Sequence, residues 1–275
     1  MIHYSSQSIK VFQSVLYQTN STVIETENLI LVVDPNWLPN EIEEIKNYIK
    51  AKQNNKPIYL LFTHSDYDHI IGYKAIENVI TIASVDFANN ERKDEIIEQI
   101  RSFDDQYYIK RNYKIEYPKI DHIIFEDGQK LMLGDTTITF YKANGHTEDG
   151  LFAVIEPLGL FIAGDYLSDV EFPFIFTNSY DYEKTLLKIN DILKKHKVEL
   201  LIPGHGNVGK GVNEILKRQN DSLNYILKLR EQLKNNKPID NLIQDYSFPR
   251  FLKKMHQENV DIIKKELENN EYKIK

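Results

Sequence analysis

Apolar residues follow two different periods along the chain, and each period predicts a type of secondary structure. Between residues 39 and 52, isoleucines recur every three or four positions among charged residues, which predicts an amphipathic helix. The run 58–62 is apolar throughout and predicts a strand that is buried on both faces. The same patterns predict strands at 14–17, 22–33, 79–83, 123–125, 129–133, 136–141, 151–155, 160–163 and 198–202, and helices at 73–78, 91–103, 182–196, 212–233 and 251–267.

Turn residues indicate how some of these elements are connected. Two antiparallel strands are expected at the start of the chain, joined by a turn at 19–21. Asp-Gly and Gly-Asp pairs separate the three short strands within 123–141, which predicts an antiparallel meander. Residues 86–119 lose the regular spacing and are rich in tyrosine, so we expect an insertion that covers one face of the domain.

Composition narrows the class of protein. The chain has 275 residues, 41% of them hydrophobic, which suffices for one large domain or two small ones. The net charge is −7 and no basic stripe is present, so no nucleic-acid surface is predicted. We find no apolar run of about 18 residues and no signal-like N-terminus, and therefore expect no membrane span and a cytoplasmic location. Because cysteine is absent, any metal would be held by imidazole and carboxylate groups.

Histidine and aspartate residues follow several of the predicted strands. The buried strand at 58–62 leads into four such residues within six positions, and one more follows each of three later strands. The full set is His64, Asp66, Asp68, His69, His146, Asp165 and His205. Imidazoles and carboxylates in this number are what two closely spaced divalent metal ions require. The remaining single histidines, His3, His122, His196 and His256, are interpreted as ordinary surface or core residues.

The motifs around these residues resemble those of the metallo-β-lactamase-fold superfamily. The family signature is HxHxDH, then a His in a Gly-His-Thr context, an Asp after a strand and a final Gly-His, and the resemblance runs from about residue 22 to residue 205. It implies an α/β (α+β) fold, a four-layered αβ/βα sandwich with the metals at an edge between the sheets. It also implies that His64, His146 and Asp66 bind the first metal ion, that Asp68, His69 and His205 bind the second, and that Asp165 bridges them. Two divalent ions are expected, zinc in the first place and iron or manganese as alternatives.

Two positions depart from the family pattern. Asp66 stands where most members have histidine, so three carboxylates would offset three of the four positive charges of two divalent ions, and a bridging hydroxide would neutralise the fourth. The first metal ion would then attract anions less strongly. We therefore expect a neutral or weakly charged substrate rather than a phosphodiester or a sulfate ester. Glu148 and Asp149 replace the Pro-Gly pair that is common in the family.

The resemblance implies hydrolysis of an ester, thioester, lactone or related small molecule by a metal-bridging hydroxide. Asp68 would be the catalytic residue, orienting the hydroxide and carrying its proton to the leaving group. Two alternatives stay open. A carboxylate at position 66 is also similar to the iron-binding flavodiiron branch, which implies redox or dioxygenase-type chemistry. A non-catalytic metal-binding scaffold would have the same ligands.

The residues expected to contact the substrate are aromatic. Tyr67 lies within the first motif and could donate a hydrogen bond to a substrate oxygen. Phe172, Phe174 and Phe176 follow Asp165 and could line an apolar entrance or pack in the core. Residues 1–210 are predicted as the metallo-β-lactamase-like domain and 211–275 as a C-terminal helical extension packed on it. These helices could cover the site or form a homodimer.

Overall fold

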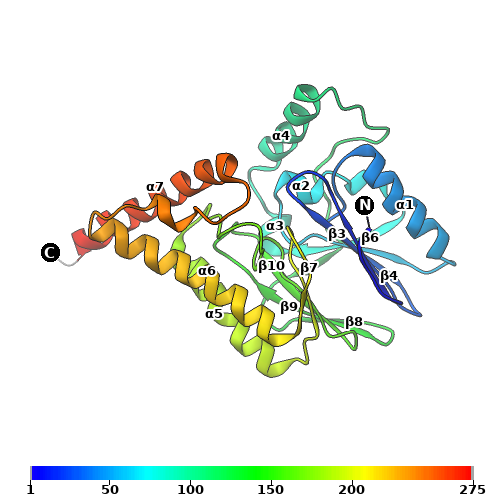
Figure 1. Cartoon of the computed structure of the whole chain (residues 1–275). Coiled ribbons are helices and arrows are strands. Elements are labelled where there is room, and N and C mark those ends of the chain that lie inside the picture. Colours follow the sequence, from blue (N-terminus) through cyan, green and yellow to red (C-terminus); the bar gives the residue numbers. More distant parts are fainter. Residues whose placement is uncertain (1, 274–275) are drawn as a thin grey trace.

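Two β-sheets face each other at the centre of the molecule, and helices cover their outer faces (Figure 1). The computed structural model describes residues 2–273. Within this range a seven-stranded sheet has the order β1-β2-β3-β4-β5-β6-β7 and a six-stranded sheet the order β13-β12-β11-β10-β9-β8. The strands are β1 (Ile2–Ser5), β2 (Ile9–Gln13), β3 (Asn20–Glu25), β4 (Ile30–Val33), β5 (Ile58–Leu61), β6 (Val79–Ser84), β7 (His122–Ile124), β8 (Lys130–Leu133), β9 (Thr136–Lys142), β10 (Leu151–Glu156), β11 (Leu160–Ile162), β12 (Leu200–Ile202) and β13 (Gly209–Lys210). The helices are α1 (Pro39–Lys52), α2 (Tyr67–Ile70), η1 (Tyr73–Ala75), α3 (Val85–Ala88), α4 (Lys93–Gln106), α5 (Ser179–Lys195), α6 (Gly211–Lys234), η2 (Asp240–Leu242) and α7 (Pro249–Lys273).

Parallel pairing in both sheets brings distant parts of the chain to one edge. In the first sheet β4, β5, β6 and β7 run parallel, while β1 to β4 pair antiparallel. In the second sheet β8 to β11 form an antiparallel meander, and β11 pairs with β12 in parallel. The carboxyl ends of β4 and β5 therefore lie together, as do those of β11 and β12. The loops after β5, β11 and β12 carry six of the seven predicted ligands, and the loop after β9 carries the seventh, His146.

Three buried clusters separate four layers. Alternate residues of a strand point to opposite faces of its sheet, and β4 and β5 show this directly. Val32 and Leu60 pack beneath α1 and α4 in one cluster, whereas Leu31 and Leu61 face the second sheet in another. A third cluster lies between the second sheet and the C-terminal helices. This arrangement confirms the predicted αβ/βα sandwich.

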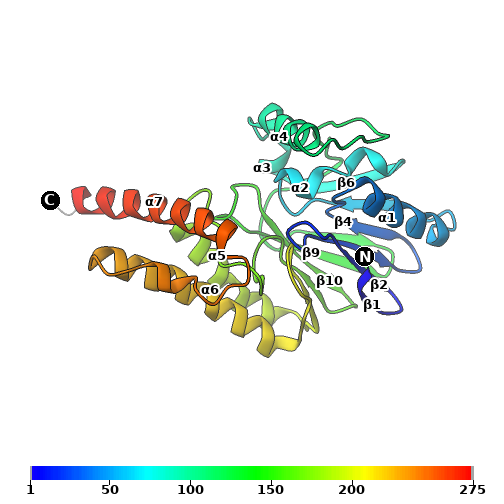
Figure 2. The same ribbon diagram turned by 45° about the horizontal axis from the view of Figure 1, so that its top comes forward.

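The C-terminal helices share the core of the second sheet. Buried Ile215, Ile226 and Leu229 of α6 and Leu252 and Ile263 of α7 all belong to the third cluster. The distal half of α6 and α7 lie side by side and extend away from the two sheets (Figure 2). Residue 1 of the predicted domain and residues 274–275 of the predicted extension lie outside the described residues. None of the helices within 2–273 combines the length and apolar character that a bilayer crossing requires.

Three predicted strands were wrong in detail. Segment 14–17 is a turn, because Tyr17 and Gln18 take left-handed backbone conformations (φ 52° and 50°) that a strand does not contain. The predicted strand 22–33 is two antiparallel strands, β3 and β4, joined by a turn closed by the Thr26 N–H donating to the Leu29 carbonyl (3.0 Å). The strand predicted at 123–125 pairs with β6 in the first sheet, so the meander starts only at β8.

Candidate metal centre

The seven predicted ligands lie together at the edge where the two sheets meet. His64, Asp66, His146 and Asp165 form one group, and Asp68, His69 and His205 form a second. In each group the nitrogen and oxygen atoms able to bind a metal lie within 4.8 Å of one another. In the first group His146 Nε2 lies 3.2 Å from Asp66 Oδ2. In the second His69 Nε2 and His205 Nε2 are 3.4 Å apart.

Asp165 is in contact with both groups. Its Oδ2 lies 3.2 Å from His146 Nε2 and 3.2 Å from His205 Nε2. Its Oδ1 lies 3.1 Å from His69 Nε2. A carboxylate whose two oxygens face the histidines of two adjacent groups has the geometry of a bridge between two ions.

Glycine residues allow the loops to approach one another closely. The loop after β11 reaches Asp165 through Gly164, and the loop after β12 reaches His205 through Gly204. A Cβ added at Gly204 would collide with Asp165 Oδ1 and would lie 3.0 Å from the His69 ring. Gly145, before His146, takes a φ of +125° and lies against the backbone of Tyr182. The glycines that precede two of the ligands are therefore required by packing at the site.

Each histidine is held by a hydrogen bond at Nδ1, which leaves Nε2 facing the centre. His146 Nδ1 donates to the Phe174 carbonyl (2.8 Å) and His205 Nδ1 to the Tyr17 carbonyl (2.9 Å). The Nε2 atoms of His64 and His146 and Oδ1 of Asp165 are buried and make no hydrogen bond. Metal-binding histidines commonly show this pattern, in which the second nitrogen is fixed by a protein acceptor.

Asp34 supports two of the histidines at once. Its Oδ2 accepts from His69 Nδ1 (3.0 Å) and from Thr63 Oγ1 (2.6 Å), while Oδ1 accepts from the Thr63 N–H (2.8 Å). Because the Thr63 hydroxyl donates its proton to Asp34, it accepts from His64 Nδ1, which lies 3.0 Å away. Asp34 thus connects the first group, through Thr63 and His64, to the second group, through His69.

The carboxylates of the centre favour positive charge on the histidines beside them. Burial lowers the pKa of His146, but Asp165 and Asp66 outweigh it and raise that pKa to about 10. Burial and His69 lower the pKa of His64, and the same two carboxylates raise it to about 10. Burial raises the pKa of Asp66, and His146 and His64 outweigh it and hold it well below its usual range. Carboxylates that stabilise positive charge on neighbouring groups so strongly would attract divalent cations for the same reason.

Comparison with known proteins decides the family. The sequence model of the metallo-beta-lactamase superfamily matches residues 15–205, more than half of the chain. The chain belongs to the metallo-beta-lactamase superfamily. No curated protein matches this sequence.

Several solved structures have a similar fold. A metallo-beta-lactamase family protein from Thermus thermophilus is similar over 91% of this chain and 92% of its own, with a TM-score of 0.64 and 14% identity. A superfamily protein from Sulfolobus tokodaii is similar over 94% of this chain and 97% of its own, with a TM-score of 0.55 and 14% identity. The rubredoxin oxygen:oxidoreductase from Desulfovibrio gigas is similar over 86% of this chain and 68% of its own (TM-score 0.54, 14% identity). At these identities the likeness concerns the fold alone.

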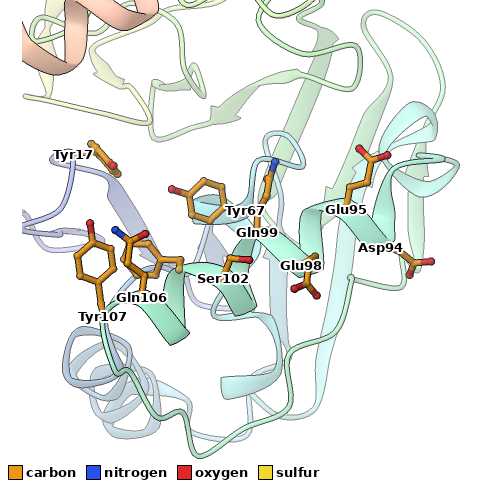
Figure 3. A pocket seen from close by; sticks show the side chains of 10 residues that line it. Tyr17, Tyr67, Asp94, Glu95, Glu98, Gln99, Ser102, Gln106 and Tyr107 are labelled. Carbon is orange, nitrogen blue, oxygen red and sulfur yellow. The ribbon is translucent and has the colours of Figure 1, made fainter.

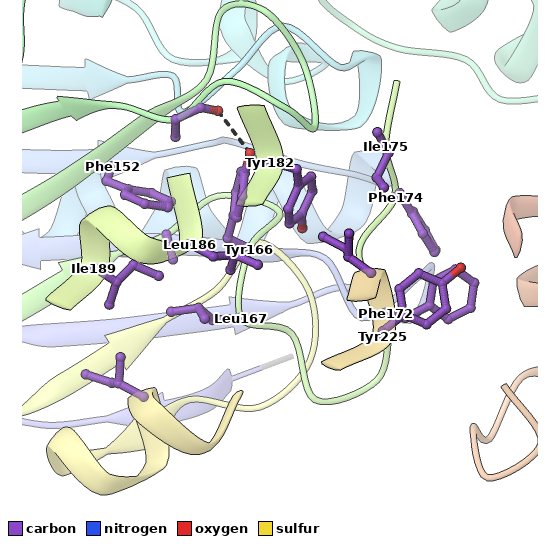
Figure 4. Packing of buried hydrophobic residues seen from close by; sticks show 14 of the residues in the cluster. Phe152, Tyr166, Leu167, Phe172, Phe174, Ile175, Tyr182, Leu186, Ile189 and Tyr225 are labelled. Carbon is purple, nitrogen blue, oxygen red and sulfur yellow. Dashed lines mark hydrogen bonds between the residues drawn. The ribbon is translucent and has the colours of Figure 1, made fainter. Parts of the chain in front are cut away.

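Of the three phenylalanines predicted at the substrate site of this metallo-beta-lactamase fold, two are buried and one is exposed. Phe172 is 3% exposed and stacks on Tyr225 in the third cluster, with ring centroids 4.6 Å apart (Figure 4). Phe174 is also buried, although its carbonyl holds His146. Both belong to the core, so they do not line an entrance. Phe176 is 44% exposed and its ring centroid lies 5.0 Å from that of His146.

Several residues around the centre were missed from sequence. Asp34 directly follows β4, as other members of the set follow strands, so the same pattern could have indicated it. Thr19 Oγ1 lies 3.3 Å from Asp68 Oδ2, and no motif marks it. Burial of the Glu171 carboxyl raises its pKa to about 7. His205 acts to lower this pKa, and the negative charge of Asp165 acts to raise it further. Asp149, at the position of the usual Pro-Gly, is buried, and its carbonyl accepts from Ser84 Oγ (2.7 Å).

Asp34→Asn is expected to weaken metal binding in the superfamily site by about 10- to 100-fold, because the neutral amide no longer fixes His69 and Thr63 in their orientations. The matched control is Asp121→Asn. Asp121 directly precedes β7 and also accepts from a threonine N–H and hydroxyl, those of Thr81, at 2.9 and 3.0 Å. No described hydrogen bond or ion pair joins it to the centre. Competition of each variant with a chelator measures the affinity, and equal metal affinity in the two variants would contradict the role of Asp34.

Proposed function

We propose that this protein is a dinuclear metal-dependent hydrolase acting on an ester, thioester, lactone or related small molecule. The observation that carries the proposal is the contact of Asp165 with histidines of both groups, at 3.1 and 3.2 Å. His64, Asp66 and His146 would hold one ion, Asp68, His69 and His205 the other, and Asp165 would bridge them. Zinc is proposed, because zinc accepts mixed imidazole and carboxylate ligands.

The residues fit such ions by three criteria. All ligand-type atoms are imidazole nitrogens or carboxylate oxygens, which suit zinc, manganese and iron. Buried Nε2 and Oδ1 atoms without hydrogen bonds face the centre. The carboxylates Asp66 and Asp165 stabilise positive charge on the neighbouring imidazoles far above neutral pH, as the raised pKa of His64 and His146 indicates.

Two divalent ions held there would supply a hydrolytic nucleophile from water at neutral pH and polarise the substrate oxygen. No nucleophilic side chain is then needed. Asp68 is 8% exposed and its Oδ2 lies 3.6 Å from both His69 Nε2 and His205 Nε2. From that position Asp68 would accept the proton of the attacking water and pass it to the leaving group.

Asp68→Asn is expected to reduce kcat by about 10²- to 10⁴-fold with little change in KM, because the amide cannot accept the proton. The measurement is steady-state kinetics at saturating metal, with the bound metal of each sample determined. Asp86→Asn is the control, since Asp86 is a surface residue paired with Lys142 (2.8 Å). A rise in KM with unchanged kcat would overturn the proton-transfer role.

The carboxylate at position 66 supports a neutral substrate and also keeps one alternative open. Asp66 Oδ2 lies 3.7 Å from His64 Nε2 and 3.2 Å from His146 Nε2, so it adds a negative charge to the first group. This favours neutral esters and lactones over phosphodiesters and sulfate esters. It equally suits iron, and the solved neighbours include an oxygen:oxidoreductase by its title.

The deciding experiment combines metal analysis with a substrate panel. The protein is purified without added metal, and zinc, manganese and iron are quantified per chain. Lactones, thioesters, β-lactams and phosphodiesters are then tested for hydrolysis, together with oxygen consumption under reducing conditions. Two equivalents of zinc or manganese with ester or lactone turnover would support the proposal. Iron with oxygen consumption would support redox chemistry, and little metal with no turnover would support a scaffold.

A further inference from the structure

A groove of about 810 Å³ lies beside the metal centre, between α2, α4 and the turn that carries Tyr17 (Figure 3). Its volume is within the range of pockets that hold small-molecule ligands. Its lining comprises Tyr17, Tyr67, Asp94, Glu95, Glu98, Gln99, Ser102, Phe103, Gln106 and Tyr107. Most of these residues belong to α4, in the segment that the sequence predicts to be an insertion.

The groove connects to the centre through two of its tyrosines. Tyr67 stands between Asp66 and Asp68 in the chain. The carbonyl of Tyr17 accepts the hydrogen bond of His205 Nδ1 (2.9 Å). In Figure 3 the Tyr67 hydroxyl points toward Tyr17 across the groove. A substrate whose reacting bond lies at the centre would therefore extend its remaining part along this groove.

The walls offer aromatic rings and hydrogen-bonding groups. Tyr17 and Tyr107 are 42% and 57% exposed, so their rings are available to a ligand. Along α4 the residues at 95, 99, 102 and 106 recur at helical spacing and form one polar row. Figure 3 shows Glu95 and Gln99 of this row on the side of α4 where Tyr67 lies.

The charges of the lining disfavour an anionic ligand and do not form a strong cation site. The lining contains three carboxylates and neither lysine nor arginine. Two of these carboxylates are already paired, Glu95 with Arg92 (2.8 Å) and Glu98 with Arg101 (3.5 Å), which reduces their field. Paired carboxylates still accept hydrogen bonds at their remaining lone pairs, and glutamine both donates and accepts.

We propose that this groove binds a neutral, hydroxyl-rich ring, of the sugar type, that forms the non-reacting part of the substrate. Hydroxyl groups of such a ring would be recognised by Glu95, Gln99 and Gln106, and its apolar face would pack against Tyr107 or Tyr67. As a statement about the substrate the inference rests on the proposed hydrolytic function. As a statement about binding it can be tested alone.

The binding test uses four probes of similar size: methyl glucopyranoside, methyl glucuronide, cyclohexanol and trimethylcyclohexylammonium. Each is titrated into the full-length protein as purified and followed by NMR. We expect the glucoside to bind at least about fivefold more tightly than the other three, which corresponds to about 1 kcal/mol. Preference for the ammonium probe, for cyclohexanol or for the glucuronide would overturn the proposal.

Matched variants locate the binding. Tyr107→Ala should weaken glucoside binding about fivefold or more, whereas Tyr108→Ala should leave it unchanged. The two tyrosines are neighbours, but Tyr108 is 94% exposed and does not line the groove. Gln99→Leu is compared in the same way with Gln257→Leu, an exposed glutamine of α7. Equal effects within both pairs would overturn the assignment.

A kinetic test separates this inference from the proposed function. Metal-loaded protein is given methyl 6-O-acetylglucopyranoside and cyclohexylmethyl acetate, which share the reacting ester. Hydrolysis of both at equal kcat/KM would support the proposed function and contradict the groove assignment. Glucoside binding that depends on Tyr107, without hydrolysis of either ester, would contradict the proposed function and leave the groove assignment in place.

Discussion

Replacing Asp165 with alanine is expected to lower turnover by about three orders of magnitude or more and to remove most of the bound metal. Its carboxylate is the only one of the described ligand set that faces histidines of both groups, at 3.1 to 3.2 Å. Without it each group loses an anionic oxygen, and the histidines of the two groups face one another with less compensating charge. Metal content and kcat/KM, measured on the same sample, test this expectation.

Asp191→Ala is the control for this variant. Asp191 is an exposed residue of α5 that pairs only with Lys194 (3.2 Å) among the described contacts, so its loss should change neither quantity. Folding of Asp165→Ala is checked separately by circular dichroism and thermal unfolding. A folded variant that retains two metal equivalents and at least a tenth of the wild-type kcat/KM would refute the bridging role.

The ligand residues that come directly after buried strands could be predicted from sequence. A buried apolar strand such as β5 has a strong local signal, and polar residues at its end are conspicuous. The same holds for Asp165 after β11 and for His205 after β12. The four layers were predicted too, but from the resemblance of the motifs to a known family, because the periodicity alone does not show how the elements are stacked.

The residues that hold the ligands in place could not be predicted from sequence, because their roles depend on contacts between distant parts of the chain. His205 is held by the carbonyl of Tyr17, 188 positions away. That carbonyl is placed by a turn in which Tyr17 and Gln18 have left-handed backbone conformations. The residue types of this segment predicted a strand instead. Phe172 and Phe176 are close in sequence and similar in type, yet one is buried in the core and the other is exposed beside His146. Only the packing of α6 and α7 distinguishes them.

Removal of metal is expected to abolish turnover and to lower Tm by on the order of 10 °C. A ligand present at 1,000 times its Kd stabilises the native state by about 4 kcal/mol, and 1 kcal/mol corresponds to roughly 2–4 °C for a protein of this size. Thermal unfolding with and without a chelator measures the difference, and turnover should return when zinc is added. An unchanged Tm together with full turnover after dialysis against chelator would show that the protein does not depend on metal.

The effect of metal removal on stability should increase with pH. In the metal-free protein the pKa of His64 and of His146 is raised to about 10, above the value of about 6.5 in an unfolded chain. Protonation of these histidines therefore stabilises the metal-free fold fully below about pH 6.5, and this contribution is lost as the pH rises through about 10. The metal-loaded protein does not depend on these protons, because the ions replace them. We therefore expect the difference in Tm between the two forms to be larger at pH 9 than at pH 6, and an equal or smaller difference at pH 9 would contradict this expectation.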